Sequence, residues 1–557
     1  MKRALTTSVL TFLCLAFLPA AAYAQASITG VVKDTSGAVL PGVTVEAASP
    51  AIIEKVRTAV TDGSGQYRIT ELRPGAYTVT FTLAGFNTVK RDGINLTGAF
   101  TASVDAELRV GALEETITVT GEAPIVDVQS TTRQRVMDSE AISTLPTGRN
   151  MFNLGVLIPG ISISTGGLAS QDVGGALGPE TRALVAHGGN TNDQRFMMNG
   201  VSLSSMIGGG WGGGAIPNAT GVQEMVFDTA SVNADLATGG VRINFIAREG
   251  GNQYHGTIFS NFANDKMQTT NVDAALLARN PALINAGTVD KNWDFNPGFG
   301  GPIKRDKLWF FASGRSQGAY VFAPGMFYNN NANDPTKWNF DPDLNQPASL
   351  EKTWLDAQLR VSWQVNQKNK IGVTYTQQDF CACHDAITAT TAPEAANDRR
   401  FPTQRVVLLD WTSPVSNKIL LEASGIHRVE RWGNMHLQTK DFSVDPAMIA
   451  VLDQAANVPG LGTIANLNYR ARGGANTNNN SWNNNFHYRF NVSYITGSHA
   501  IKVGMNNAHG YHDNQTYQTN TLGYRFNNGT PNQITMRALP HTIKNHVDQD
   551  LGLFAQD

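Results

Sequence analysis

The second half of the sequence alternates apolar and polar residues with a period of two, over runs long enough to constrain the fold strongly. Leu355, Ala357, Leu359, Val361, Trp363 and Val365 alternate with polar side chains, and runs 371–376 and 486–494 repeat the pattern. Successive side chains of an extended strand point to opposite faces, so each run predicts a strand with one apolar and one polar face. A soluble β-sandwich shows the same alternation, so this pattern alone leaves two fold classes open.

The connections between these runs fall into two kinds, tight and long. Tight connections lie near 302–307, 367–370, 414–418 and 497–499, and long ones near 265–292, 323–352, 381–399, 433–481 and 517–547. Short turns that alternate with long, solvated external loops are typical of outer-membrane β-barrels. Aromatic residues near strand ends suit the girdles at the two membrane interfaces, although each alone could be ordinary packing, namely Trp309, Trp354, Trp363, Trp411, Trp432 and Tyr494. The connections therefore favour part of a transmembrane antiparallel β-barrel.

The N-terminus carries the features of a cleaved export signal. Lys2 and Arg3 precede an apolar run from Val9 to Leu18, and Ala22-Tyr-Ala24 is a signal-peptidase pattern. This run is shorter than the roughly 20 residues of a spanning helix, and we expect residues 1–24 to be removed. The formal net charge of −2 gives no polycationic surface for nucleic acid.

Residues 25–110 read as a small β-sandwich, because short alternating runs are separated by regularly spaced turn signals. Segments 28–34, 40–45, 61–67 and 72–79 resemble the successive strands and turns of the carboxypeptidase regulatory-like domain. The resemblance implies a binding or spacer module, located in the periplasm, and not a peptidase. We expect Tyr67 and Tyr77 to lie in its core.

A polar, β-branched segment lies between Gly111 and Pro124, in a linker that we assign to residues 111–124. Such a strand could add to the sheet of another protein through its unpaired edge, although an ordinary linker strand is the simpler reading. By its position, the segment resembles the TonB box of TonB-dependent receptors. The resemblance implies that a TonB-type energy-coupling protein binds Glu115, Thr116, Ile117, Thr118, Val119 and Thr120.

Residues 125–251 are rich in glycine and only weakly periodic, which permits irregular loops and close backbone approach. Segments 194–201, 222–226 and 239–244 resemble strands of the plug domain of TonB-dependent receptors, with Asn199 in place of the usual acidic residue. The resemblance implies an α+β plug inside the barrel.

Residues 252–557 carry the most specific resemblance, in segments 250–256 and 299–311, which are similar to the Oar-like branch of TonB-dependent receptors. About ten strands can be counted here, whereas a barrel around a folded plug needs roughly 22. We therefore expect a mainly β protein whose barrel is incomplete, as an N-terminal fragment would be.

The expected function is import of a scarce solute through the outer membrane, in contact with its lipid. Siderophores, oligosaccharides (carbohydrate binding) and peptides all remain open as ligands, and no ligand-binding residue can be named. The alternative is a surface adhesion or assembly protein of the same architecture. No phosphate loop or catalytic constellation indicates an enzyme, and no cofactor is expected.

After signal cleavage the remaining cysteines are Cys381 and Cys383, which are too few for a disulfide-stapled fold. A local disulfide is one possibility. A metal site with His384 is another, but these neighbours would need a distant ligand to close a tetrahedral shell, so no metal site is expected.

Overall fold

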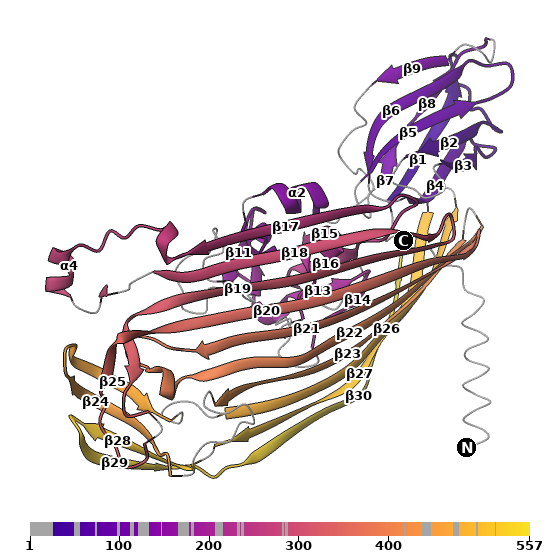
Figure 1. The fold of residues 1–557 in the computed structure, drawn as a ribbon. Coiled ribbons are helices and arrows are strands. Elements are labelled where there is room, and N and C mark those ends of the chain that lie inside the picture. Colours follow the sequence, from indigo (N-terminus) through magenta and orange to yellow (C-terminus); the bar gives the residue numbers. More distant parts are fainter. Residues whose placement is uncertain are drawn as a thin grey trace, which may run out of the picture.

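The structure is a computed structural model. It describes residues 26–49, 56–72, 75–96, 101–111, 116–120, 133–145, 147–164, 178–179, 183–205, 215–230, 234, 239–280, 283–284, 288–332, 334–416, 419–436, 447–471, 478–496, 499–518 and 520–557. These residues form an N-terminal β domain, an inner α+β domain and a long ten-stranded sheet (Figure 1). Within them, no helix is sufficiently long and apolar to cross a membrane.

The N-terminal domain consists of two packed sheets, which confirms the predicted β-sandwich. One contains β1 (Ala26–Asp34), β4 (Gln66–Leu72), β7 (Thr101–Ser103) and β8 (Ala106–Leu108). The other has the order β3-β2-β5-β6-β9, with β2 (Thr44–Ala48), β3 (Val56–Val60), β5 (Gly75–Thr82), β6 (Thr88–Leu96) and β9 (Thr116–Thr120). Tyr67 and Tyr77 are buried between the sheets as predicted, and the Tyr67 hydroxyl donates to the Val104 carbonyl at 2.6 Å.

The inner domain is built on a five-stranded sheet of order β10-β15-β16-β13-β14. Its strands are β10 (Arg133–Asp138), β13 (Arg195–Met198), β14 (Val201–Ser202), β15 (Val222–Ala230) and β16 (Arg242–Ala247). Smaller elements surround them: α2 (Ser139–Thr144), α3 (Met151–Gly155), the pair β11 (Ile161–Ser164) and β12 (Ala183–Ala186), and the 3₁₀ turns η1 (Thr191–Asp193) and η2 (Ala219–Gly221). Phe196, Met225, Phe227 and Phe245 are buried in its core.

Ten long antiparallel strands form the wall of the structure, in the number predicted. They are β17 (His255–Asn264), β18 (Val289–Lys304), β19 (Leu308–Asn329), β20 (Pro342–Asn366), β21 (Asn369–Asp385), β22 (Asn397–Ser416), β23 (Ile419–His436), β26 (Asn478–Thr496), β27 (His499–Tyr517) and β30 (His541–Gln556). Each strand pairs with the next in this order, and β17 and β30 are the two ends of the sheet.

The alternation read from the sequence sorts the side chains of the wall onto two faces. In β20, Trp354, Asp356, Gln358, Arg360 and Ser362 are buried, whereas Leu355, Leu359 and Trp363 remain 56%, 46% and 43% exposed. The polar side chains thus face the inner domain, and the apolar ones form an outer surface that only a lipid environment would cover.

The assignment of all the strand-end aromatics to interfacial girdles is wrong for Trp309 and Trp354. Trp309 is 0% exposed and donates to Asn252, and Trp354 is 7% exposed. Both belong to the inward-facing set of their strands: Trp354 is two residues from Asp356 and therefore shares its face. The side of the strand, and not nearness to its end, decides where these two indoles lie.

The long connections contain folded structure and are not only solvated loops. Four strands form an external lobe at the end of the wall opposite the N-terminal domain, in the order β25-β24-β28-β29 (Figure 1). They are β24 (Ala450–Val458), β25 (Gly462–Arg470), β28 (Leu522–Asn527) and β29 (Thr530–Met536), and η5 (Pro393–Ala395) lies against β25. The connection between β17 and β18 contains η3 (Asp265–Met267) and α4 (Ala274–Arg279), and α4 lies apart from the lobe (Figure 1). Phe340, Tyr469 and Phe526 belong to the hydrophobic core of this lobe, so apolar burial between distant loops stabilises it.

Candidate functional site

The inner domain lies against the polar face of the wall, and this interface is the candidate functional site (Figure 1). Amide side chains of the wall bind its backbone directly. Gln378 of β21 accepts from the Ile216 amide at 3.2 Å and donates back to the Ile216 carbonyl, and Gln358 of β20 donates to the Gly221 carbonyl at 3.3 Å. Asn218 and Asn296 exchange two amide hydrogen bonds of 3.1 and 2.9 Å.

A four-charge network joins the end of the inner domain to three strands of the wall. Glu249 accepts from Arg360 of β20 at 2.9 Å and from Lys370 of β21 at 2.7 Å. Arg360 also makes two hydrogen bonds, of 2.8 and 3.0 Å, to Asp410 of β22. Two cations and two anions balance, which permits the Arg360 side chain to be 2% exposed without an uncompensated charge. The inner domain is therefore held by ion pairs, which can be released when water or another charged group replaces one of the paired side chains.

Asn199, which stands where the resemblance to a plug domain implies an acidic residue, also lies at the interface. Its side chain accepts from the Ala247 amide at 2.9 Å and approaches Asp410 at 3.5 Å. A carboxylate here would face Asp410, so a neutral amide suits this position.

Two further arginines of the wall donate to backbone carbonyls of the inner domain. Arg428 of β23 donates to Leu203 at 2.8 Å and forms a buried ion pair with Glu430. Arg489 of β26 donates to Gly200 at 2.9 Å. Apolar contacts continue beside them, because Val406, Leu408 and Ile426 of the wall belong to the same buried cluster as the core of the inner domain.

A pocket opens between the inner domain and strands β19 to β21. It is lined by Arg149, Asn150, Met151, Phe152, Gly178, Pro179 and Ile216 on one side and by Arg315, Gln317, Trp354 and Phe380 on the other. Arg315 pairs with Asp294 at 2.7 Å and lies over the Trp354 ring at 5.1 Å. The pocket thus combines guanidinium groups with flat aromatic surfaces.

The segment predicted to bind the coupling protein forms β9. Thr116 to Thr120 pair in parallel with residues 88–92 of β6, at the end of a sheet of the N-terminal domain. One edge of β9 is therefore occupied by the chain itself, and no other strand of the described residues pairs with its second edge. Glu115 lies outside the described residues.

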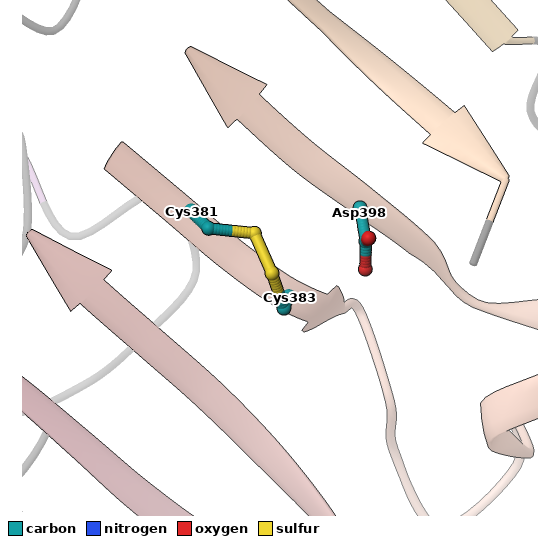
Figure 2. Close-up of side chains that lie close together, drawn as sticks. All are labelled: Cys381, Cys383 and Asp398. Atoms are coloured by element: carbon teal, nitrogen blue, oxygen red, sulfur yellow. A yellow bond between two sulfur atoms is a disulfide. The ribbon is translucent and has the colours of Figure 1, made fainter. Parts of the chain in front are cut away.

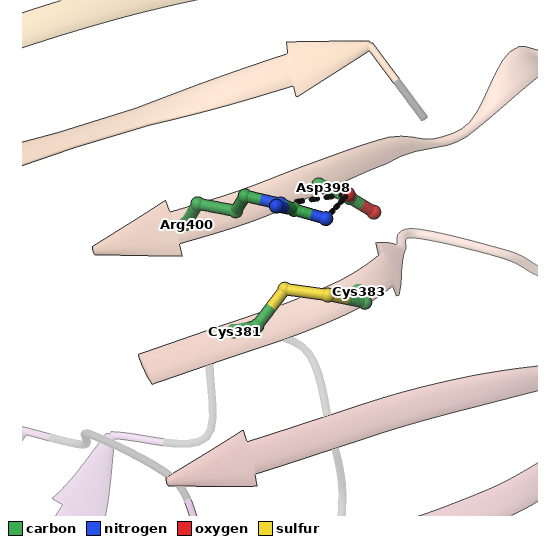
Figure 3. The surroundings of a disulfide bond; sticks show 4 residues. All are labelled: Cys381, Cys383, Asp398 and Arg400. Carbon is green, nitrogen blue, oxygen red and sulfur yellow. Dashed lines mark hydrogen bonds and ion pairs between the residues drawn. A yellow bond between two sulfur atoms is a disulfide. The ribbon is translucent and has the colours of Figure 1, made fainter. Parts of the chain in front are cut away.

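Cys381 and Cys383 form the local disulfide that was one of the two possibilities (Figure 2). Asp398 of the neighbouring β22 is close by, with its ligand atom and both sulfurs within 4.8 Å of one another. Arg400 pairs with Asp398 at 2.7 Å (Figure 3). Metal binding needs thiolates, and the sulfurs of a disulfide are not thiolates, so these groups are no metal site in the oxidised state. The side chain of His384 lies outside the described part of the chain.

Sequence reasoning missed the residues that hold the inner domain, above all Glu249, Arg360 and Asp410. Arg360 lies on a face that alternation marks as polar, and a charge there signals a partner inside the barrel. Asp410 shares its face with the apolar Val406 and Leu408, so alternation gives no such signal for it. Which partner Arg360 meets depends on long-range packing, which the local pattern does not encode.

Known proteins match the chain in both of its β regions. Residues 27–109 match the carboxypeptidase regulatory-like domain, and residues 315–554 match an outer membrane beta barrel domain. A relative named TonB-dependent transporter Oar, from Myxococcus xanthus, is 33% identical over 305 residues, which cover 52% of this chain and 27% of the relative.

Among solved structures, the outer membrane transporter YddB from Escherichia coli shares the fold with a TM-score of 0.52 at 13% identity. The similarity covers 76% of this chain and 54% of that protein. The chain spans about a quarter of the length of the curated relative and about half of the solved structure. Its ten-stranded wall, its regulatory-like domain and these similarities together place the chain in the outer membrane, and over the matched residues the chain is similar to an Oar-like TonB-dependent receptor.

Proposed function

We propose that the protein imports a scarce small solute across the outer membrane, driven by a TonB-type coupling protein that binds Glu115 to Thr120. In this proposal the inner domain, within residues 125–251, acts as the plug of the barrel formed by residues 252–557. The N-terminal domain, residues 25–110, lies in the periplasm after removal of residues 1–24. The relative from Myxococcus xanthus, named a TonB-dependent transporter, supports the same activity here.

The observation that carries the proposal is the polar interface between the inner domain and the inward face of the wall. Glu249, Gln378 and Arg428 take part in hydrogen bonds and ion pairs across the interface, which water or a moving segment can replace. A domain held in this way can rearrange while the strand ladder of the wall stays intact. No covalent chemistry is needed, in keeping with a transporter and not an enzyme.

The chain order suggests how a pull would reach the inner domain. β10 is the next strand after β9 that the structure describes, and it lies at the edge of the inner sheet, where it pairs only with β15 among the described strands. A force applied at Thr116–Thr120 would first separate β9 from β6 and would then act on β10. An edge strand can leave without breaking the pairing between β15 and β16, so the plug could open stepwise.

Proline substitution of β9 tests the proposal in the intact outer-membrane protein. Ile117→Pro with Val119→Pro removes two backbone N–H groups, which strand addition requires. We expect energised uptake to be lost while solute still binds the cell surface. The matched control, Ile117→Val with Val119→Ile, keeps two N–H groups and β-branched side chains and should transport normally. Unchanged uptake in the proline variant would refute the proposal.

A surface adhesion or assembly role is the second candidate, favoured by the external lobe. Its own hydrophobic core and four-stranded sheet make it a folded surface that a macromolecule could bind. This role predicts that the proline variant of β9 retains full function and that disruption of the lobe abolishes it.

A further inference from the structure

Two cysteines and one carboxylate gather on the outer face of the wall, near the lobe end of its strands (Figure 2). Cys381 and Cys383 are two residues apart on β21, so both side chains point to the same side of the strand. In the pairing with β20, they stand opposite Thr353 and Glu351, on the face of the exposed Leu355. The cysteines therefore lie just beyond the apolar outer surface, on the side of the wall that faces away from the inner domain.

Asp398 joins the two cysteines from the neighbouring strand. In the pairing of β21 with β22, Cys381 stands opposite Arg400, and Asp398 shares the face of Arg400 because it lies two residues before it. The register of the two strands shifts beside Cys383, and such a β-bulge redirects side chains. One ligand atom of each of the three residues lies within 4.8 Å of the other two. The fold thus brings two sulfurs and a carboxylate oxygen together from two strands.

These three groups have the chemistry and the spacing of a zinc-type site once the disulfide is open. Thiolates and carboxylates bind Zn²⁺ at about 2.0–2.3 Å in a tetrahedral arrangement, so neighbouring ligand atoms stand roughly 3.6–3.8 Å apart. The ligand atoms of Cys381, Cys383 and Asp398 already lie within 4.8 Å of one another, so rotation of the side chains reaches that separation. Three protein ligands leave the fourth position of the tetrahedron to water.

Burial and charge both favour a cation at this place. Cys381 is 7% exposed and Asp398 is 2% exposed, so these ligand atoms have lost most of their water before an ion binds. Two thiolates and one carboxylate carry one negative charge more than a divalent ion neutralises. Arg400 offsets that charge, because its guanidinium contacts Oδ2 of Asp398 at 2.7 and 2.9 Å (Figure 3). Carboxylates that bind a metal are commonly oriented by such a hydrogen-bonding partner.

We propose that Cys381, Cys383 and Asp398 form a redox-controlled binding site for a zinc-type divalent cation, which exists when the disulfide is reduced. Two molecules of a small thiol are oxidised to one disulfide while the Cys381–Cys383 bond opens to two thiols. The cation then displaces both thiol protons and accepts electron pairs from the two sulfurs and the carboxylate. The reverse exchange with a small disulfide closes the sulfur–sulfur bond and releases the cation.

This exchange replaces a cross-link within one strand by a cross-link between two strands. The disulfide joins residues of β21 only, whereas the cation joins β21 to β22 at the two ends of the connection that contains η5. In that connection the Ala392 amide donates to the Asn468 carbonyl of the external lobe at 2.7 Å. A bound cation should therefore stabilise the contact between this connection and the lobe. The site goes beyond the proposed import function and requires neither transport nor a coupling protein.

Titration of the purified, intact protein with Cd²⁺ in detergent tests the site, because cadmium bound to thiolates absorbs in the ultraviolet. The protein is first reduced with a phosphine, which takes up oxygen from water as the disulfide opens and is then removed without air. We expect the reduced protein to bind one Cd²⁺ more than the oxidised protein, and Zn²⁺ to displace that ion. Bound Cd²⁺ should also slow hydrogen exchange at the Ala392 amide, and unchanged exchange there would refute the cross-link between the strands.

Two variants and a matched control identify the ligands. Cys381→Ser with Cys383→Ser should lose the ultraviolet absorption, and Asp398→Asn, which keeps both thiols, should bind Cd²⁺ at least about tenfold more weakly. The control is Asp513→Asn, because Asp513 also lies near the lobe end of the wall and contacts a basic side chain, His546, at 3.2 Å. The affinity of this control should stay within about threefold of the wild type, since half-exposed charges contribute little.

Heat-modified mobility on gels checks that each variant folds. The proposal is overturned if the reduced protein binds no more Cd²⁺ than the oxidised protein, or if the double serine variant binds like the wild type. It is equally overturned if folded Asp398→Asn retains the affinity of the wild type, because the carboxylate would then be no ligand.

Discussion

Glu249→Gln is the substitution that most directly weakens the attachment of the inner domain. The carboxylate accepts charge-assisted hydrogen bonds from Arg360 at 2.9 Å and Lys370 at 2.7 Å. Such bonds contribute about 1.5–3 kcal/mol each, and glutamine retains one weaker acceptor. With Lys370 25% exposed and partly screened by solvent, we expect a net loss of about 2–3 kcal/mol of attachment free energy.

Hydrogen exchange of the intact protein in detergent measures this loss. A change of 2–3 kcal/mol corresponds to about 30- to 150-fold more frequent local opening. Amides of β16, directly before Glu249, should exchange faster by that factor, whereas amides of β20 and β21 should not change. Glu422→Gln, the same replacement on the wall, should leave β16 unaffected.

The charge balance of the network also predicts the behaviour of a double variant. Glu249→Gln leaves one uncompensated cation, and Lys370→Met leaves one uncompensated anion. The double variant is neutral, so its exchange should be slower than the two single effects combined would give. Equal exchange in wild type and Glu249→Gln, or equal acceleration by Glu422→Gln, would refute the reasoning.

Three further predictions concern other parts of the molecule. Arg428→Met leaves the buried carboxylate of Glu430 without its cation and should destabilise the protein by about 3–5 kcal/mol in thermal unfolding. Methionine at both positions should recover most of this loss. Equal melting temperatures of the single and double variants would contradict this prediction. Burial raises the pKa of Glu394 in the external lobe to about 7, so the lobe should be most stable below about pH 4.5 and lose stability as pH rises through 7. Urea-induced opening of the lobe, followed by tryptophan fluorescence, should show this slope, and Glu394→Gln should abolish it. Gly30→Ala places a Cβ 2.1 Å from a backbone carbonyl oxygen and should unfold the N-terminal domain in exchange measurements, whereas Gly37→Ala, with open space around it, should cost only about 1 kcal/mol.

The fold could be predicted from sequence to the extent that local periodicity determines it. Alternation in 355–366 sets which side chains of β20 face inward, and turn signals delimit the strands of the N-terminal domain. The external lobe was not predicted, because β24 pairs in parallel with β28 across about 70 residues of sequence. Such a pairing depends on the wall bringing two loops together, which no local pattern reveals.

The candidate site was less accessible to sequence reasoning for the same physical reason. The segment Thr116–Thr120 was identified from its composition and position, and it is a strand as expected, but its pairing with β6 was not foreseen. The partners of Arg360 lie 111 and 50 residues away along the chain. Charges on a polar face predict that an ion pair exists, and only the packed structure identifies its members.

Spin-label accessibility along β20 tests the central claim, that the wall separates lipid from an enclosed polar interior. Labels would be placed one at a time from residue 354 to 363 in the protein reconstituted in bilayers. Collision with oxygen should be high at Leu355, Leu359 and Trp363, and low for both oxygen and a water-soluble nickel complex at the buried positions between them. The account would be contradicted if the nickel complex reached both faces equally, or if accessibility showed no period of two.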